Sequence, residues 1–130
     1  TPVEKQFSIT DWLNGDGVLL MGHPPKYLES VNPINAMLLR LICDELQSRE
    51  DVSAPHTWIV LDEFRWMKEV ECMAELLGLG RSKGASILLG IQDFSGMKEA
   101  FGADRADEIL GLCESKTFLK VGNYLSIAYP

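Results

Sequence analysis

The amino-acid sequence predicts an α/β protein with a mainly parallel sheet, arranged as a three-layer sandwich. Two observations predict this class: four short apolar segments have the character of β-strands, and segments with helical spacing of apolar residues lie between them. The first three strand segments are apolar almost throughout, which is typical of strands buried on both faces of a parallel sheet. The order β-α-β-α-β-α-β then implies right-handed crossovers between the strands.

The predicted strands are separated by polar connections that contain proline or glycine. The four predicted strands are GVLLMG (17–22), TWIVLD (57–62), ASILLGIQ (85–92) and KTFLKVG (116–122). No internal repeat or low-complexity tract interrupts this alternation. We therefore expect residues 1–130 to form one compact unit.

The first long helix is predicted from the spacing of its apolar residues. One helical face carries Ile34, Met37, Leu38, Leu41 and Ile42. Asn32 before Pro33 is typical of an N-cap followed by the first helical position, so we expect the helix to begin there. Similar spacing predicts further helices over 67–77, 95–102 and 104–113.

Composition and charge exclude several classes of protein. Twelve Lys and Arg against nineteen Asp and Glu give a formal net charge of -7, which disfavours a protein that coats nucleic acid through phosphate contacts. Three separated cysteines form no CxxC pair, so they indicate a reduced, cytosolic setting rather than a disulfide framework or a zinc site. No apolar run reaches the 18 or more residues of a membrane span.

Polar side chains follow the ends of two predicted strands, where ligands of open parallel sheets bind. The second predicted strand ends in Asp62 and Glu63, the third ends in Gln92 and Asp93, and the loop GRSKGAS (80–86) leads into the third. An apolar strand that ends in Asp-Glu fits a Walker B motif, in which the Asp holds Mg²⁺ and the Glu acts on the attacking water. The same pattern also occurs where a strand simply meets solvent.

The ordered set of motifs resembles the ATPase domain of conjugative type IV coupling proteins, the TraD/TraG family. It consists of WIVLDEF, a helix, and GLGRSKGASILLGIQDFSGMKEAFG, which closes on the aromatic-glycine pair Phe101–Gly102. FSITDWL with GVLLMG resembles the family's lead-in strand, and NPINAMLLRLICDEL resembles its helix before Walker B. The resemblance covers nearly the whole chain.

The resemblance implies a role for each polar position. Asp62 corresponds to the Mg²⁺ ligand, Glu63 to the catalytic base and Gln92 to a sensor of the γ-phosphate, and all three would contact the nucleotide. Arg81 corresponds to an arginine finger offered to the neighbouring subunit of a six-membered ring. The simpler alternatives are a solvated loop cation for Arg81 and a strand-end amide that binds loop backbone for Gln92.

One departure from the family pattern is the absence of the phosphate-binding loop GxxxxGK[ST]. The resemblance therefore implies the C-terminal half of a RecA-like P-loop NTPase domain, without its Walker A strand and loop. It can be an excised piece or a stand-alone relative. We expect the isolated chain to bind neither ATP nor Mg²⁺ tightly and to show no ATPase activity, because the phosphate cradle is missing.

The family's function supplies the corresponding expectations for the parent protein. It would be a homohexameric ATPase motor that drives single-stranded DNA and a relaxosome protein toward a type IV secretion channel in bacterial conjugation. It would lie at the cytoplasmic face of the inner membrane, held by segments that this chain does not contain. Two alternatives are a non-catalytic relaxosome-docking module and part of a DNA-translocating ring ATPase of the FtsK/HerA kind.

Overall fold

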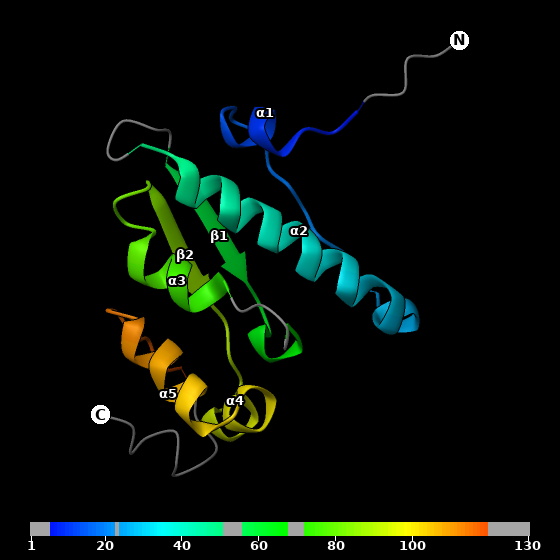
Figure 1. Ribbon diagram of the computed structural model, residues 1–130. Coiled ribbons are helices and arrows are strands. Elements are labelled where there is room, and N and C mark those ends of the chain that lie inside the picture. Colours follow the sequence, from blue (N-terminus) through cyan, green and yellow to red (C-terminus); the bar gives the residue numbers. More distant parts are fainter. Residues whose placement is uncertain (1–5, 23, 51–55, 68–71, 120–130) are drawn as a thin grey trace.

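The computed structural model describes residues 6–22, 24–50, 56–67 and 72–119. In chain order the elements are α1 (Ile9–Leu13), η1 (Pro25–Tyr27), α2 (Leu28–Ser48), β1 (Thr57–Leu61), η2 (Phe64–Trp66), α3 (Cys72–Leu79), β2 (Ala85–Leu89), α4 (Phe94–Phe101) and α5 (Ala103–Leu112). Figure 1 shows α2 running beside β1, α3 beside β2, and α4 and α5 as a pair beyond the ends of the strands.

The two strands β1 and β2 are parallel neighbours, with Thr57 opposite Ala85 and Leu61 opposite Leu89. The connection between them contains α3, as the predicted crossover requires. The α/β class with a parallel sheet is therefore confirmed. Within the described residues no helix combines the length and the apolar character needed to cross a bilayer.

The hydrophobic core lies on one face of this sheet. Along β1 the side chains alternate between buried and exposed, and Thr57, Ile59 and Leu61 point into the core. Helices α2 and α3 supply the facing side chains, among them Leu39, Ile42, Leu46, Cys72, Met73 and Leu76, and Ala106 and Ile109 of α5 belong to the same buried cluster. The described residues thus supply two layers, the sheet and the helices on one side of it.

On the other face of the sheet several described apolar side chains are exposed, which corrects the prediction of strands buried on both faces. Trp58, Val60 and Leu88 are 66%, 63% and 57% exposed. They belong to apolar strands, but alternation along an extended chain sends every second side chain away from the helices. An apolar surface of this kind is typical of a sheet that another layer covers.

Helix α2 begins earlier than predicted. It starts at Leu28, so Pro33 lies inside the helix and Asn32 is not its N-cap. Pro33 is close enough to the N-terminal end that its missing N–H removes one of the first intrahelical hydrogen bonds, while the helix continues to Ser48. Asn35 faces inward and donates from Nδ2 to the carbonyl oxygen of Gly22 over 2.8 Å.

Two of the four predicted strands are absent from the described residues. Residues 17–22 form no strand, and Val18 and Leu20 are 93% and 89% exposed. The carbonyls at both ends of this segment accept hydrogen bonds from side chains, at Gly17 from Trp12 and at Gly22 from Asn35, in place of a neighbouring strand. Residues 116–119 likewise form no strand, and residues 120–122 of that prediction lie outside the described residues.

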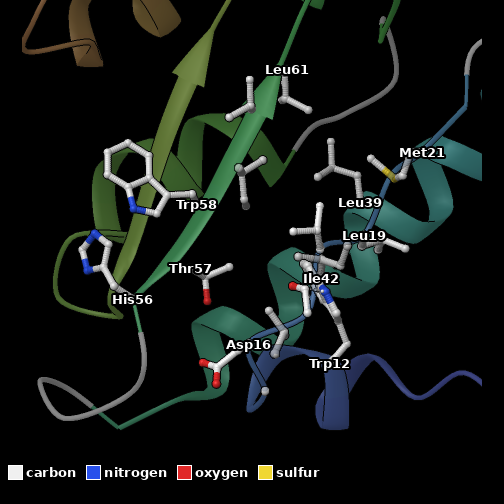
Figure 2. A pocket seen from close by; sticks show the side chains of 16 residues that line it. Trp12, Asp16, Leu19, Met21, Leu39, Ile42, His56, Thr57, Trp58 and Leu61 are labelled. Carbon is white, nitrogen blue, oxygen red and sulfur yellow. Dashed lines mark hydrogen bonds between the residues drawn. The ribbon is translucent and has the colours of Figure 1, made fainter.

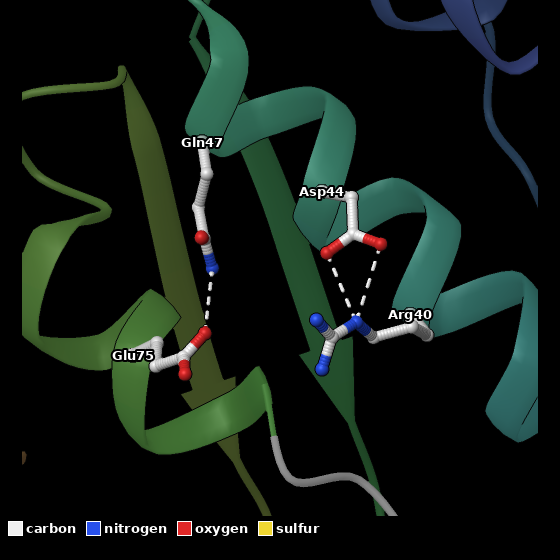
Figure 3. Close-up of polar contacts among 4 residues, drawn as sticks. All are labelled: Arg40, Asp44, Gln47 and Glu75. Atoms are coloured by element: carbon white, nitrogen blue, oxygen red, sulfur yellow. Dashed lines mark hydrogen bonds and ion pairs between the residues drawn. The ribbon is translucent and has the colours of Figure 1, made fainter.

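The interface between α2 and α3 combines an exposed polar edge with a buried pair of thiols. Figure 3 shows the polar edge, where Gln47 Nε2 donates to Glu75 Oε2 over 3.4 Å and Arg40 pairs with Asp44 along α2. Cys43 and Cys72 are fully buried and form no disulfide. The hydrogen bond that these two thiols share raises the pKa of Cys43 and lowers the pKa of Cys72.

Candidate functional site

The two acids that follow β1 form a tight turn rather than a continuation of the strand. Asp62 Oδ1 accepts a hydrogen bond from the backbone N–H of Glu63 over 3.0 Å. Glu63 has φ 50° and ψ 49°, and among the described residues it is the single non-glycine residue with positive φ. This left-handed conformation costs a residue with a Cβ atom roughly 1–2 kcal/mol. Contacts on both sides of Glu63 must therefore hold the turn.

The contacts that hold the turn come from β2 and α4. Gly90, which follows β2, donates its N–H to Leu61 O over 2.8 Å and accepts from Phe64 N–H over 3.0 Å. The Phe64 side chain is fully buried and stacks on Phe101, with the ring centroids 5.0 Å apart and the planes at 15°. The acid turn is thus fixed by two backbone hydrogen bonds and an aromatic anchor.

Gln92 joins the acid turn from the segment that follows β2. Its Nε2 atom donates to Glu63 Oε1 over 2.7 Å. Asp62 and Gln92 are exposed and Glu63 is half-buried, so all three face a region open to solvent at the carboxyl ends of β1 and β2. The structure therefore brings together three of the four residues to which the family resemblance assigns roles.

Arg81 lies at the opposite end of the strands, near their amino ends. It is exposed in the turn 80–84, which precedes β2, whereas the acids follow β1. The strands are parallel and β1 has five residues. At ~3.3 Å per residue, about 13–17 Å therefore separates the amino ends of the strands, near Arg81, from their carboxyl ends, near the acids. Arg81 and Glu63 of one chain cannot contact the same phosphate group.

The turn that carries Arg81 is tied to the rest of the fold. Lys83 Nζ donates to Arg49 O over 2.6 Å, and the Arg49 guanidinium donates to Leu13 O and to Thr57 Oγ1 over 2.7 and 3.2 Å. Lys83 therefore helps to hold the turn 80–84 against the end of α2. Because these hydrogen bonds hold the turn, they restrict the positions that the Arg81 side chain can reach.

Asp93 serves the fold rather than the site. Its Oδ1 accepts from Gly96 N–H over 2.6 Å and caps α4. An Asp that precedes a helical pattern is a signal for an N-cap, so its role is readable from the sequence. Gly90, Phe64 and Phe101 carry no such signal, because their roles depend on contacts between segments that are distant in the chain.

The oxygen atoms of the acid turn suit a magnesium ion that is bound mainly through a nucleotide. Among the described residues no group of three or more His, Cys, Asp or Glu side chains could enclose a metal ion. Mg²⁺ commonly binds proteins through one or two carboxylates and completes its octahedron with water and phosphate oxygens. Asp62, exposed and oriented by the Glu63 amide, fits that limited role.

An apolar groove of about 570 Å³ lies elsewhere, along the edge of β1 that does not pair with β2. Figure 2 shows it between β1 and the segment around Leu19 and Met21, and Leu39 and Ile42 of α2 also line it. None of the four predicted site residues lines this groove. It is separate from the acid turn.

Solved structures show which fold this arrangement represents. The bacterial conjugative coupling protein TrwB in its unbound monoclinic form matches with a TM-score of 0.74 and 21% identity, over 82% of this chain and 26% of TrwB. TrwB with the ATP analogue ADPNP and TrwB with ADP and Mg²⁺ match over the same shares with 21% identity and TM-scores of 0.73 and 0.74. These matches show the RecA-like P-loop NTPase fold, of which the described residues form a part.

The sequence comparison identifies the family within this fold. Residues 1–128 match the family described as "Type IV secretion-system coupling protein DNA-binding domain", and the chain belongs to that family. The coupling protein TraD of Escherichia coli K12 is 21% identical over 122 residues, which are 89% of this chain and 17% of TraD. The resemblance to coupling proteins inferred from the motifs is confirmed, and the chain spans about a sixth of TraD and a quarter of TrwB.

Proposed function

We propose that this chain is the Walker B, arginine-finger and sensor part of the ATPase motor of a type IV coupling protein. The parent motor drives DNA and relaxosome transfer in bacterial conjugation. One observation carries the proposal: Asp62, Glu63 and Gln92 meet at the carboxyl ends of two parallel strands, with Gln92 bonded to Glu63 over 2.7 Å. Its membership of the coupling-protein family supports the cargo, DNA.

Asp62 and Gln92 would act as positioning groups for the nucleotide. The carboxylate of Asp62 would hold Mg²⁺, directly or through its water shell, and when bound the ion neutralises charge on the phosphates. TrwB, with the same fold, has been captured with ADP and Mg²⁺. Gln92 keeps hydrogen-bonding capacity on its amide oxygen and on its second N–H, which would detect a γ-phosphate beside Glu63.

Glu63 would act as the general base. A carboxylate can take a proton from water, and the hydrogen bond from Gln92 to Oε1 would orient the Glu63 carboxylate for that transfer. The strained φ of 50° places the Glu63 side chain at the open end of the sheet. Backbone strain at such a position is common where a side chain must be held for chemistry.

Arg81 would act on the nucleotide of a neighbouring subunit. It stands at the far edge of the sheet from the acids, so a finger role requires a second copy of the chain, as in a homohexameric ring. An arginine supplied in trans to a phosphoryl-transfer site is worth roughly 10³–10⁵ in rate. The exposure of Arg81 on a tethered turn suits this role.

The remaining part of the site would come from a segment with a phosphate-binding loop. The open sheet face with Trp58, Val60 and Leu88 is the surface that such a segment would cover. A chain that carries both halves would bind nucleotide at their junction. We place the parent protein at the cytoplasmic face of the bacterial inner membrane, in keeping with the family resemblance to TraD.

The decisive experiment uses a protein that carries this chain together with its phosphate loop. Glu63→Gln should lower kcat by at least 10²-fold and leave nucleotide binding unchanged, because it removes the base and keeps the phosphate cradle. Glu108→Gln on the exposed surface of α5 is the matched control and should turn over normally. Normal turnover in the Glu63→Gln protein would exclude the proposed role.

A further inference from the structure

Gly90 makes two hydrogen bonds that enclose the acid turn. Its N–H bonds to the residue before the pair, Leu61, over 2.8 Å, and its carbonyl bonds to the residue after the pair, Phe64, over 3.0 Å. Asp62 and Glu63 are the two residues between these points. A single residue at the end of β2 therefore sets the width of the turn that carries both acids.

The space around Gly90 shows what a side chain at this position would displace. A Cβ atom built there would lie 2.7 Å from Asp62 Oδ1 and 3.3 Å from Asp62 Cα. Gly84 and Gly102 are the described glycines with positive φ, so Gly90 is not required for a left-handed conformation. The constraint comes from close approach, because an added Cβ atom would displace the Asp62 carboxylate and crowd the Asp62 Cα atom.

The atom that an added Cβ atom would displace, Asp62 Oδ1, also orients the acid turn. Asp62 Oδ1 is the oxygen that accepts the Glu63 N–H over 3.0 Å, so moving it disturbs the orientation of Asp62 and the backbone of Glu63 together. Alanine is the smallest side chain that could replace glycine, and it already reaches this oxygen. The geometry thus links one glycine to both acids.

We propose that Gly90 is a positioning residue that fixes the Asp62 carboxylate in the orientation needed to hold a divalent cation. This inference rests on the proposed function, in which Asp62 is the metal-holding acid. Gly90 itself touches neither metal nor nucleotide. It acts through the two backbone bonds and through the space that it leaves to Asp62.

The first test measures structure without nucleotide, in the 130-residue chain. Gly90→Ala should raise the amide exchange rates of Glu63 and Phe64 by at least tenfold, as measured by NMR. The control is Gly78→Ala in α3, where an added Cβ atom meets nothing within 4 Å. Exchange rates in the Gly90→Ala chain equal to those of the control would overturn the inference.

The second test separates a local clash from general damage through a double-mutant cycle. Gly90→Ala should lower Tm, and the drop should shrink to less than half in an Asp62→Ala chain, where the crowded oxygen is absent. This comparison remains informative if Gly90→Ala alone folds poorly. An equal drop in both backgrounds would show that the glycine serves the fold and not Asp62.

The third test measures metal binding in the protein that also carries the phosphate loop. Mn²⁺ affinity in the presence of ADPNP, followed by electron paramagnetic resonance, should fall at least tenfold in Gly90→Ala, with ADPNP affinity in EDTA unchanged. Asp62→Ala is the reference. If Asp62→Ala binds Mn²⁺ normally, the proposed role of Asp62 fails; if only Gly90→Ala binds it normally, the role of Asp62 stands and the inference about Gly90 fails.

Discussion

Gln92 Nε2 and Glu63 Oε1 lie 2.7 Å apart, and this hydrogen bond joins the carboxyl ends of two parallel strands across 29 positions of sequence. The amide of Gln92 offers a donor to a carboxylate, so the contact is charge-assisted and stronger than a neutral one. A proton acceptor that must stay aligned with water benefits from such a partner. The pair therefore fixes the Glu63 carboxylate relative to the segment that follows β2, as the proposed role of general base requires.

Replacing Gln92 should lower turnover without preventing nucleotide binding. Hydrogen bonds to charged groups contribute about 1.5–3 kcal/mol, and the exposure of this pair favours the lower value. We expect Gln92→Ala to reduce kcat about tenfold. Gln92→Glu should reduce it further, because two carboxylates then stand side by side. Steady-state ATPase assays on a protein with the complete site would measure both.

The control for this prediction is Gln47→Ala, which removes the other glutamine bonded to a glutamate, at the α2–α3 edge. It should keep normal turnover. If Gln92→Ala and Gln47→Ala have the same kcat as the parent, Gln92 does not support the base.

Replacing Phe64 should destabilise the whole domain. Its ring is fully buried and stacks on Phe101, and truncation of a buried aromatic to alanine costs about 3–5 kcal/mol. Phe64→Ala should therefore lower the urea midpoint of the chain sharply. Phe7→Ala, at a side chain that is 56% exposed, should change it little. Equal midpoints for the two variants would show that the stack does not anchor the acid turn.

The elements nearest the site are those that the sequence predicts best. The strands TWIVL and ASILL are continuous apolar runs, and both begin at the predicted residues. They end earlier than predicted, β1 at Leu61 instead of Asp62 and β2 at Leu89 instead of Gln92. The acids and Gln92 are predictable because parallel strands present their carboxyl ends at a common edge. Asp93 is the exception at that edge, since its carboxylate is used by the helix that follows.

The segments that the sequence predicts less well depend on partners distant in the chain. Residues 17–22 have an apolar strand pattern, but side chains of Trp12 and Asn35 take their terminal carbonyls and no strand pairs with them in the described structure. Pro33 marks a helix start by local rules, and α2 extends past it. The close approach of Gly90 to Asp62 likewise appears only when two strands are placed side by side.

The three cysteines should differ in reactivity. Cys43 and Cys72 are fully buried, whereas Cys113 is half-buried and its Sγ donates to Ile109 O over 3.4 Å. Burial raises the pKa of Cys113, and nearby Lys116 offsets this only in part. Iodoacetamide should modify Cys113 alone in the native chain, more slowly than a free thiol at pH 8, because less of it is thiolate.

Intact mass measured over time at several pH values would check this prediction. The rate of Cys113 modification should keep rising at pH values above the usual pKa range of a thiol, because the pKa of Cys113 is raised. In urea all three cysteines should be modified. Cys113→Ser should block modification of the native chain. Rapid double modification at Cys43 and Cys72 would contradict the packing of α2 against α3.

Arg81 gives the sharpest test of assembly, because one chain cannot bring it to its own acids. In a protein with the complete site, Arg81→Ala should lower kcat by roughly 10³-fold or more if it is a finger. Mixing this protein with Glu63→Gln subunits, which lack a base but keep Arg81, should restore part of the activity at junctions where an intact base meets an intact arginine. Arg105→Ala, on α5, is the control and should need no rescue. Loss of activity in Arg81→Ala without rescue would make Arg81 a structural residue of its turn, and unchanged activity would leave it as a solvated loop cation.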